Sequence, residues 1–220
     1  MVKVKERAEA LTSEMSTDQQ SAIRALGNEL RIAVIEGDLE TENDAERIRR
    51  HGVPAIQIAT GSACHLDADM VHAALHRLNL DEVDLLFVEN VGNLVCPASF
   101  DLGQHRNVTL LSVPEGDDKP AKYPVIFRAA DRVLVTKQDL APLMPEFSGE
   151  RVADAVRSLA STAPVHSLSA KTGEGLADWC DWLRAERREQ QARRSQGATV
   201  RPSIQPDGAR LHAAAGDIRS

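Results

Sequence analysis

The chain has 220 residues, 42% of them apolar, and a formal net charge of −7 from 26 Lys and Arg against 33 Asp and Glu. Nucleic acids and anionic membranes attract basic surfaces, so this acidic balance argues against either as a partner. Residues 1–15 are charged and lack the apolar stretch of a secretory signal, and no apolar run reaches the roughly 20 residues of a membrane span. The three cysteines form a sparse, odd set, which predicts free thiols and a cytoplasmic protein.

Residues 1–30 are expected to form a helical segment, because apolar side chains recur among charged ones at helical spacing. The pattern then changes to short apolar runs, which are typical of buried strands. These runs cover residues 32–35, 55–58, 84–88, 108–113, 132–135 and 164–168. Helices are expected near residues 41–50, 67–79, 148–161 and 174–191.

The alternation of short strands with helices predicts an α/β domain over residues 31–188, with a mostly parallel sheet flanked by helices. Residues 189–220 are rich in Arg, Gln, Ser, Gly and Ala and hold few large apolar residues, so a flexible tail is expected there. Polar residues stand at the C-terminal end of almost every predicted strand. Ligands bind at that edge of open parallel sheets, which makes it the expected position of a site.

The first candidate motif is Thr136-Lys137-Gln138-Asp139, which directly follows a predicted strand. A carboxylate at Asp139 can accept hydrogen bonds from N1–H and N2–H₂ of guanine, a paired donor edge that adenine lacks. A second strand ends in Ser169-Ala170-Lys171, where a backbone N–H can reach guanine O6. The alternative interpretation is a solvated turn in which Asp139 caps a helix.

Acidic residues follow two further strands. Asp38 and Glu89 are candidates to hold Mg²⁺ and its water shell, and the backbone N–H of Gly92 is a candidate contact for a γ-phosphate. The alternative is that these acids only cap the helices that follow. From the residues alone, both interpretations stay open.

Cys64, His65 and Cys96 are candidate metal ligands, because thiolate and imidazole are the groups that Zn²⁺ and Ni²⁺ prefer. One chain offers only these three ligands here, whereas a two-fold dimer would bring a second set. The alternative is a pair of buried structural cysteines beside a surface histidine. His72 and His76 are also spaced for chelation, at i and i+4 of a predicted helix, although the surrounding pattern is that of an ordinary amphipathic helix.

Several long strings, in order, resemble the hydrogenase nickel-incorporation GTPases of the HypB type over about residues 30–185. They include IAVIEGDLETENDAERI, TGSACHLDADMVHAAL, DLLFVENVGNLVCPASFDLG and SAKTGEGLADWCDWL. The resemblance implies a P-loop GTPase-like fold of the SIMIBI type, which binds GTP with Mg²⁺ and dimerises in the GTP-bound state. It also implies delivery of Ni²⁺ to [NiFe]-hydrogenase, with other maturation proteins and the hydrogenase large subunit as partners.

Residue by residue, the resemblance implies that Cys64, His65 and Cys96 bind Ni²⁺ or Zn²⁺. It gives Asp38 and Glu89 the roles of Mg²⁺ and switch acids in GTP hydrolysis. The guanine base is expected to be held by Lys137, Asp139, Ser169 and Lys171.

The sequence departs from that family in its phosphate-binding loop, GxxxxGK[ST], which would stand just before Thr17. None of the six lysines of the chain is preceded by glycine. The sequence therefore predicts impaired GTP binding and hydrolysis, and a sheet that lacks the interior strand before that loop. Two other interpretations stay open: a metal-binding or interaction module that uses no nucleotide, and a non-functional truncated paralogue.

Overall fold

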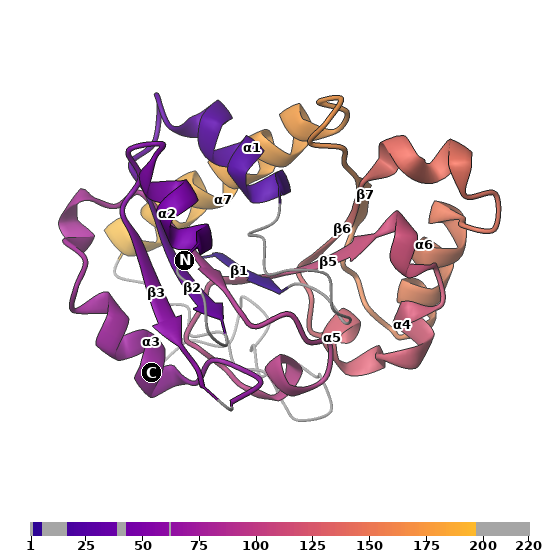
Figure 1. The fold of residues 1–220 in the computed structure, drawn as a ribbon, viewed down its shortest axis with the longest axis horizontal. Helices are drawn as coiled ribbons and strands as arrows, with labels where there is room; N and C mark the ends of the chain where they lie inside the picture. Colours follow the sequence, from indigo (N-terminus) through magenta and orange to yellow (C-terminus); the bar gives the residue numbers. More distant parts are fainter. Residues whose placement is uncertain (1, 6–16, 39–42, 62, 197–220) are drawn as a thin grey trace.

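A single parallel sheet of seven strands organises the molecule (Figure 1). The computed structural model describes residues 2–5, 17–38, 43–61 and 63–196. The strands are β1 (Val2–Lys5), β2 (Ile32–Asp38), β3 (Ala55–Ala59), β4 (Leu85–Glu89), β5 (Arg106–Ser112), β6 (Arg132–Thr136) and β7 (Val165–Ser167). They pair in the order β3-β2-β4-β1-β5-β6-β7, and every pair is parallel.

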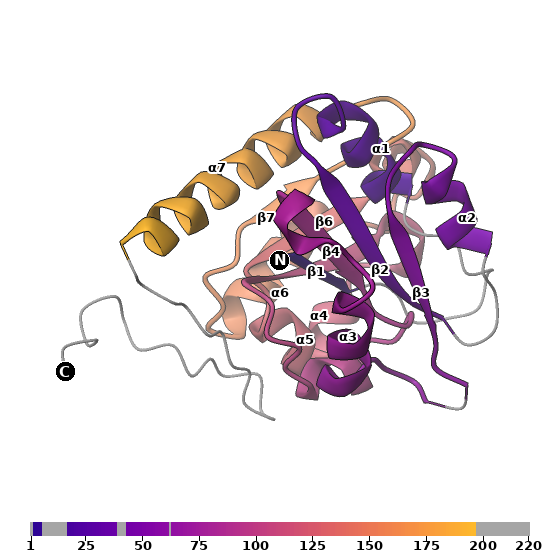
Figure 2. The ribbon, with the colours of Figure 1, turned by 90° about the vertical axis from the view of Figure 1, so that its left-hand side faces the viewer.

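Helices cover both faces of this sheet, as the apolar strand pattern predicts. They are α1 (Thr17–Leu26), α2 (Asn43–Arg49), α3 (Ala68–Leu75), α4 (Lys119–Lys122), α5 (Pro124–Arg128), α6 (Gly149–Ser158) and α7 (Leu176–Ser195). Short 3-10 turns stand at η1 (Leu80–Glu82), η2 (Cys96–Ser99), η3 (Val113–Glu115) and η4 (Gln138–Leu143). Figure 2 shows α7 lying along one side of the sheet, away from α3, α4 and α5.

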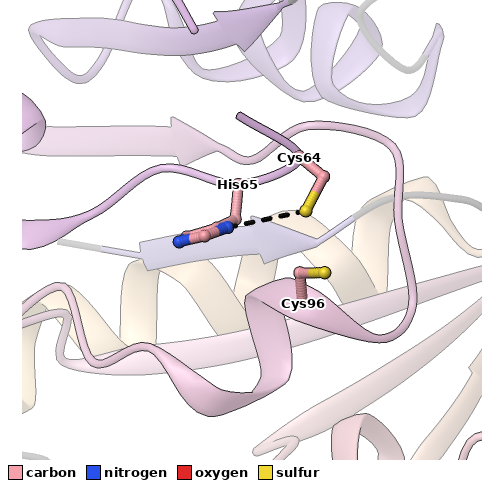
Figure 3. Close-up of side chains that lie close together, drawn as sticks. All are labelled: Cys64, His65 and Cys96. Atoms are coloured by element: carbon pink, nitrogen blue, oxygen red, sulfur yellow. Dashed lines mark hydrogen bonds between the residues drawn. The ribbon is translucent and has the colours of Figure 1, made fainter. Parts of the chain in front are cut away.

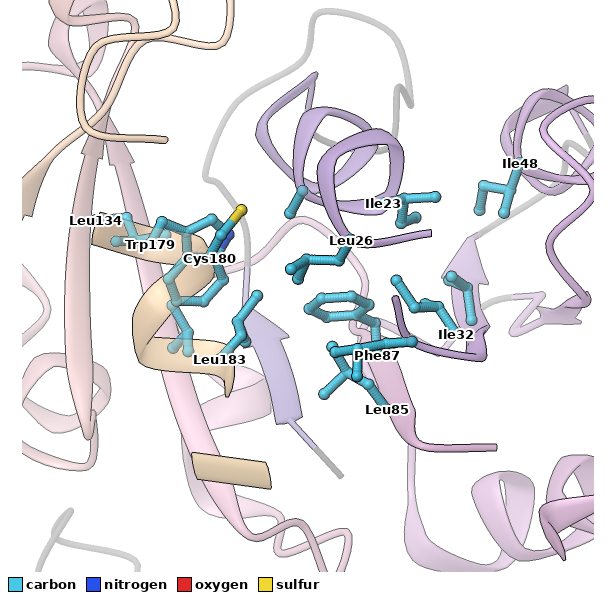
Figure 4. Packing of buried hydrophobic residues seen from close by; sticks show 14 of the residues in the cluster. Ile23, Leu26, Ile32, Ile48, Leu85, Phe87, Leu134, Trp179, Cys180 and Leu183 are labelled. Carbon is cyan, nitrogen blue, oxygen red and sulfur yellow. The ribbon is translucent and has the colours of Figure 1, made fainter. Parts of the chain in front are cut away.

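The core has one layer on each face of the sheet. On the first face, Phe87 of β4 packs among Leu26 of α1 and Leu183 of α7, all of them fully buried (Figure 4). On the second face, α3 packs Val71 over β2 and β4, and α5 and α6 cover β5 and β6. Burial on both sides explains why the strands are continuous apolar runs.

The six strands expected between residues 32 and 168 are all present, and so are the four helices expected around them. The expectation of a helix throughout residues 1–30 is wrong for Val2–Lys5, which is strand β1, and right for Thr17–Leu26. The expected loss of an interior strand is also wrong, because β1 lies between β4 and β5 and pairs with both. The four residues of β1 thus fill the position between β4 and β5 and pair with both strands.

Helix α7 continues to Ser195, past the domain boundary expected at residue 188, which stays a prediction. An ion pair between Arg193 and Glu189, one turn apart, supports the last turns of this helix. Residues 197–220, the rest of the expected tail, lie outside the described part of the chain. In the part that is described, no helix combines the length and the apolar character of a membrane span.

Candidate functional site

Cys64, His65 and Cys96 come together at the C-terminal edge of the sheet (Figure 3). Their ligand atoms all lie within 4.8 Å of one another. The Sγ atom of Cys64 lies 3.7 Å from Nδ1 of His65. Cys64 is exposed, whereas His65 and Cys96 are half-buried, so the cluster is open to solvent on one side.

Two separate loops supply this cluster. Cys64 and His65 stand in the loop between β3 and α3, and Cys96 begins η2 in the loop after β4. The sheet order places β2 between β3 and β4, so the two loops must bend towards each other over the end of β2. The site therefore depends on contacts between loops.

Two asparagines make those contacts. The buried side chain of Asn90 accepts the backbone N–H of Leu66 at 2.8 Å and of Val91 at 3.0 Å, which ties the first loop to the end of β4. Asn93 donates from Nδ2 to the carbonyl of Cys64 at 3.3 Å and accepts the N–H of Cys96 at 3.2 Å through Oδ1. One side chain thus spans both loops.

Two packing contacts fix the loop that carries Cys64 and His65. Leu66 is fully buried against β2, where a Cβ atom at Gly37 would approach its Cγ to 2.6 Å. Only glycine at position 37 lets Leu66 enter that space. The His65 ring stacks on Phe100, with ring centroids 3.8 Å apart and an angle of 20° between the planes. This stacking therefore fixes the orientation of the imidazole ring.

The thiols of the cluster differ from the third thiol of the chain. A hydrogen bond with Cys96 raises the pKa of the Cys64 thiol above its usual range, and desolvation adds to the effect. Cys180 lies buried in α7, and desolvation raises the pKa of its thiol too. Only Cys64 and Cys96 are placed where a soft cation could reach them.

The acidic candidates lie at the ends of β2 and β4. Glu89 ends β4, is 6% exposed, and stands in register with Glu36 of β2, which is 3% exposed. Asp38 is the last residue of β2, two positions beyond Glu36, and Gly92 is exposed in the loop after Glu89. The structure thus brings Glu89 beside Glu36, a buried carboxylate that sequence reasoning did not select.

The guanine candidates come together beyond β6 and β7. Ser169 is fully buried and donates from Oγ to Oδ1 of Asp139 at 2.6 Å. Nζ of Lys171 lies 3.7 Å from the other carboxylate oxygen of Asp139. Both contacts lower the pKa of Asp139, and the hydrogen bond from Ser169 is the larger cause. Lys137, the N-cap of η4, lies in the left-handed region at φ 56°, an uncommon conformation for a residue other than glycine.

The phosphate side of a nucleotide site has no matching residues in the sequence. Residues 6–16, between β1 and α1, contain neither glycine nor lysine, and they lie outside the described part of the chain. A phosphate cradle needs close backbone N–H groups, which glycines allow, and a lysine to balance charge. The residues present fit a guanine base and do not fit a triphosphate.

Sequence reasoning selected the ligand candidates and missed the residues that hold them. Asn90, Asn93 and Phe100 act through contacts across long stretches of chain, which no local pattern reveals. One signal was available for Asn93, because an asparagine that precedes a turn often accepts a backbone N–H two residues on, as it does from Val95 at 2.7 Å.

Comparison with known proteins first defines the class. The crystal structure of FlhF complexed with GTP/Mg(2+) is 14% identical to this chain, with a TM-score of 0.51. The match covers 76% of this chain and 65% of the FlhF chain. At that identity the likeness shows a shared fold and nothing more. The sequence profile described as "CobW/HypB/UreG, nucleotide-binding domain" matches residues 20–167.

The chain belongs to the CobW/HypB/UreG nucleotide-binding domain family. It is similar to HypB from Helicobacter pylori in complex with nickel, with 38% identity, a TM-score of 0.77 and coverage of 86% of this chain and 87% of that one. It is also 52% identical over 165 residues to the hydrogenase maturation factor HypB of Azotobacter vinelandii. That match covers 75% of this chain and 54% of the relative, so the chain spans about half the length of that protein.

Proposed function

We propose that this chain binds nickel through Cys64, His65 and Cys96 and serves in the maturation of [NiFe]-hydrogenase. The observation that carries the proposal is the convergence of the three ligand atoms within 4.8 Å of one another at the strand ends. It is supported by the similarity to the H. pylori protein whose crystal structure contains nickel. Thiolate and imidazole donors suit Ni²⁺ and also Zn²⁺.

The open side of the cluster suits a cation that is carried and then released. Structural zinc sites are closed by four protein ligands, whereas these three ligands leave at least one coordination position vacant. A second copy of the chain, related by a two-fold axis, would supply a matching set, and a homodimer is part of this proposal. The acceptors of the metal would be other maturation proteins and the hydrogenase large subunit, in a cytoplasm that keeps the thiols reduced.

The nucleotide part of the proposal is limited to the base. Asp139, Lys137 and Ser169 can select guanine, with Lys171 beside them. Asp38 and Glu89 remain the candidates to hold Mg²⁺, and Gly92 remains the candidate phosphate contact. GTP would lack the phosphate cradle, and phosphate positioning supplies most of the catalysis in such enzymes. We therefore expect weak binding of GTP and little or no hydrolysis.

A nickel titration of the apo chain tests the metal assignment. Cys64→Ser and Cys96→Ser should each remove the tightest Ni²⁺ binding step measured by calorimetry, because each removes one thiolate ligand. Cys180→Ser is the matched control, since this thiol is buried in α7, and it should leave that step unchanged. An unaltered stoichiometry and affinity in the double variant at positions 64 and 96 would overturn the assignment.

The second candidate function is a metal-binding module that uses no nucleotide. The lack of glycine and lysine in residues 6–16 favours it. Titration of the chain with GTP and Mg²⁺ separates the two candidates, because the module predicts no binding. Low-micromolar GTP affinity with measurable turnover would exclude both the module and the expected impairment.

A further inference from the structure

Two histidine side chains lie close together outside the cluster described above. His72 and His76 are exposed on α3, and a hydrogen bond joins their Nε2 atoms at 3.0 Å, so a bound cation would take the place of the shared proton. The two rings meet edge to face, with centroids 4.6 Å apart and an angle of 85° between the planes. Neither the cysteine cluster nor the guanine loops use these residues.

The spacing of the two nitrogens fits adjacent positions around one metal ion. With metal–nitrogen bonds of about 2.1 Å, two nitrogens 3.0 Å apart subtend an angle of about 90° at the metal. That is the angle between neighbouring ligands in octahedral or square-planar coordination, which Ni²⁺ and Cu²⁺ adopt. In tetrahedral coordination the nitrogens would lie farther apart, so Zn²⁺ fits less well.

The structure of α3 holds His72 and His76 on the same side of the helix. The Asp67 side chain accepts the N–H of Met70 at 2.8 Å and caps the helix at its start, while Val71 and Ala74 bury its inner face. His72 lies in the last turn and His76 is the C-cap with helical backbone angles, so the i, i+4 relation holds. The C-terminal end of a helix carries partial negative charge, which favours a bound cation.

We propose that His72 and His76 form a second transition-metal site on α3, for a divalent cation of the class that imidazole binds, with Ni²⁺ and Cu²⁺ preferred over Zn²⁺. The remaining coordination positions are filled by water. With two protein ligands, the site holds its cation more weakly than a site with three, and it exchanges the cation with solvent. The assignment does not depend on a role in hydrogenase maturation.

The test uses the untagged full chain with Cys64→Ser and Cys96→Ser, titrated with NiSO₄ by calorimetry. This background should still bind about one Ni²⁺. H72Q or H76Q should each lower the affinity by at least about tenfold, because even the loss of an outer-shell partner costs about 10- to 100-fold. His51→Gln is the matched control, since His51 is also exposed and lies outside α3. The same titration with ZnSO₄ should give a weaker affinity.

The proposal would be overturned if adding H72Q/H76Q to the Cys64→Ser, Cys96→Ser variant left its Ni²⁺ affinity unchanged. It would also be overturned if that folded cysteine variant bound no Ni²⁺. If circular dichroism shows that the cysteine variants fail to fold, the test is instead the number of Ni²⁺ ions bound per chain in the wild-type background. The H72Q/H76Q variant should then take up one Ni²⁺ fewer than the wild type. Equal uptake would overturn the proposal while leaving the cysteine cluster intact.

Discussion

The side chain of Asn93 donates to the carbonyl of Cys64 at 3.3 Å while it accepts the backbone N–H of Cys96 at 3.2 Å. The two candidate thiols therefore share one positioning residue that is not itself a ligand. Residues that orient metal ligands in this way are commonly worth a factor of about 10 to 100 in metal affinity.

We expect Asn93→Ala to weaken Ni²⁺ binding at the cluster by about 10- to 100-fold, because the two loops lose their common partner. Calorimetry of the apo chain measures this. Asn93→Asp keeps the acceptor for Cys96 and removes the donor to Cys64, so its loss should be intermediate. Equal affinity of the wild type and Asn93→Ala would contradict the positioning role.

Gly37→Ala should destabilise the fold and disturb the loop that carries Cys64. A Cβ atom at position 37 would lie 2.6 Å from Cγ of Leu66, which is fully buried and has no room to withdraw. Overpacking of this kind costs about 1–3 kcal/mol in the free energy of unfolding, measured by denaturant titration.

Gly149→Ala is the matched control for Gly37→Ala. A Cβ atom at Gly149 meets nothing within 4 Å, and the residue begins α6. Alanine there should be neutral or slightly stabilising, because it restricts the unfolded chain. A loss at Gly149 as large as that at Gly37 would show that the approach to Leu66 is not the cause.

Asp84 should make folding stability depend on acid pH. Its carboxylate accepts from Nε of Arg31 at 3.0 Å and from Nη2 of Arg187 at 2.7 Å, and these contacts hold the pKa of Asp84 well below its usual range. A carboxyl whose pKa is lowered by folding adds stability above its unfolded pKa, and that stability is lost as the pH falls.

Asp84→Asn should therefore lower the free energy of unfolding by about 1.5–3 kcal/mol at neutral pH, the range for hydrogen bonds to charged groups. The difference from the wild type should shrink as the pH falls below about 4. Asp181→Asn is the control, because Asp181 is 72% exposed in its pair with Arg184 and should matter by less than about 1 kcal/mol. A difference that stays constant down to acid pH would contradict the assignment.

Asp139 should carry whatever preference for guanine the chain retains. In Asp139→Asn one of the two acceptor oxygens becomes an amide donor, which opposes N1–H or N2–H₂ of the base. We expect GDP affinity, measured by calorimetry, to fall at least about tenfold. Equal affinity of the wild-type chain for GDP and ADP would contradict the guanine assignment.

The sequence alone predicts most of the sheet, because its strands are buried on both faces and are therefore continuous apolar runs. It fails at Val2–Lys5, where Val and Lys alternate and the strand exists through its pairing with β4 and β5. The candidate ligands are predictable from their residue types and strand-end positions. The hydrogen bonds by which Asn90 and Asn93 hold the two loops together are not predictable, because contacts between distant loops leave no local periodicity in the sequence.

The place of β1 also constrains the order of assembly. Val2 pairs with Phe87 on one side and with Arg106 on the other, so this strand has no neighbour until far more of the chain has been synthesised. Contacts between such distant segments form slowly, because a long loop must close first. The two halves of the sheet are thus joined by β1, which can pair only after both β4 and β5 have been synthesised.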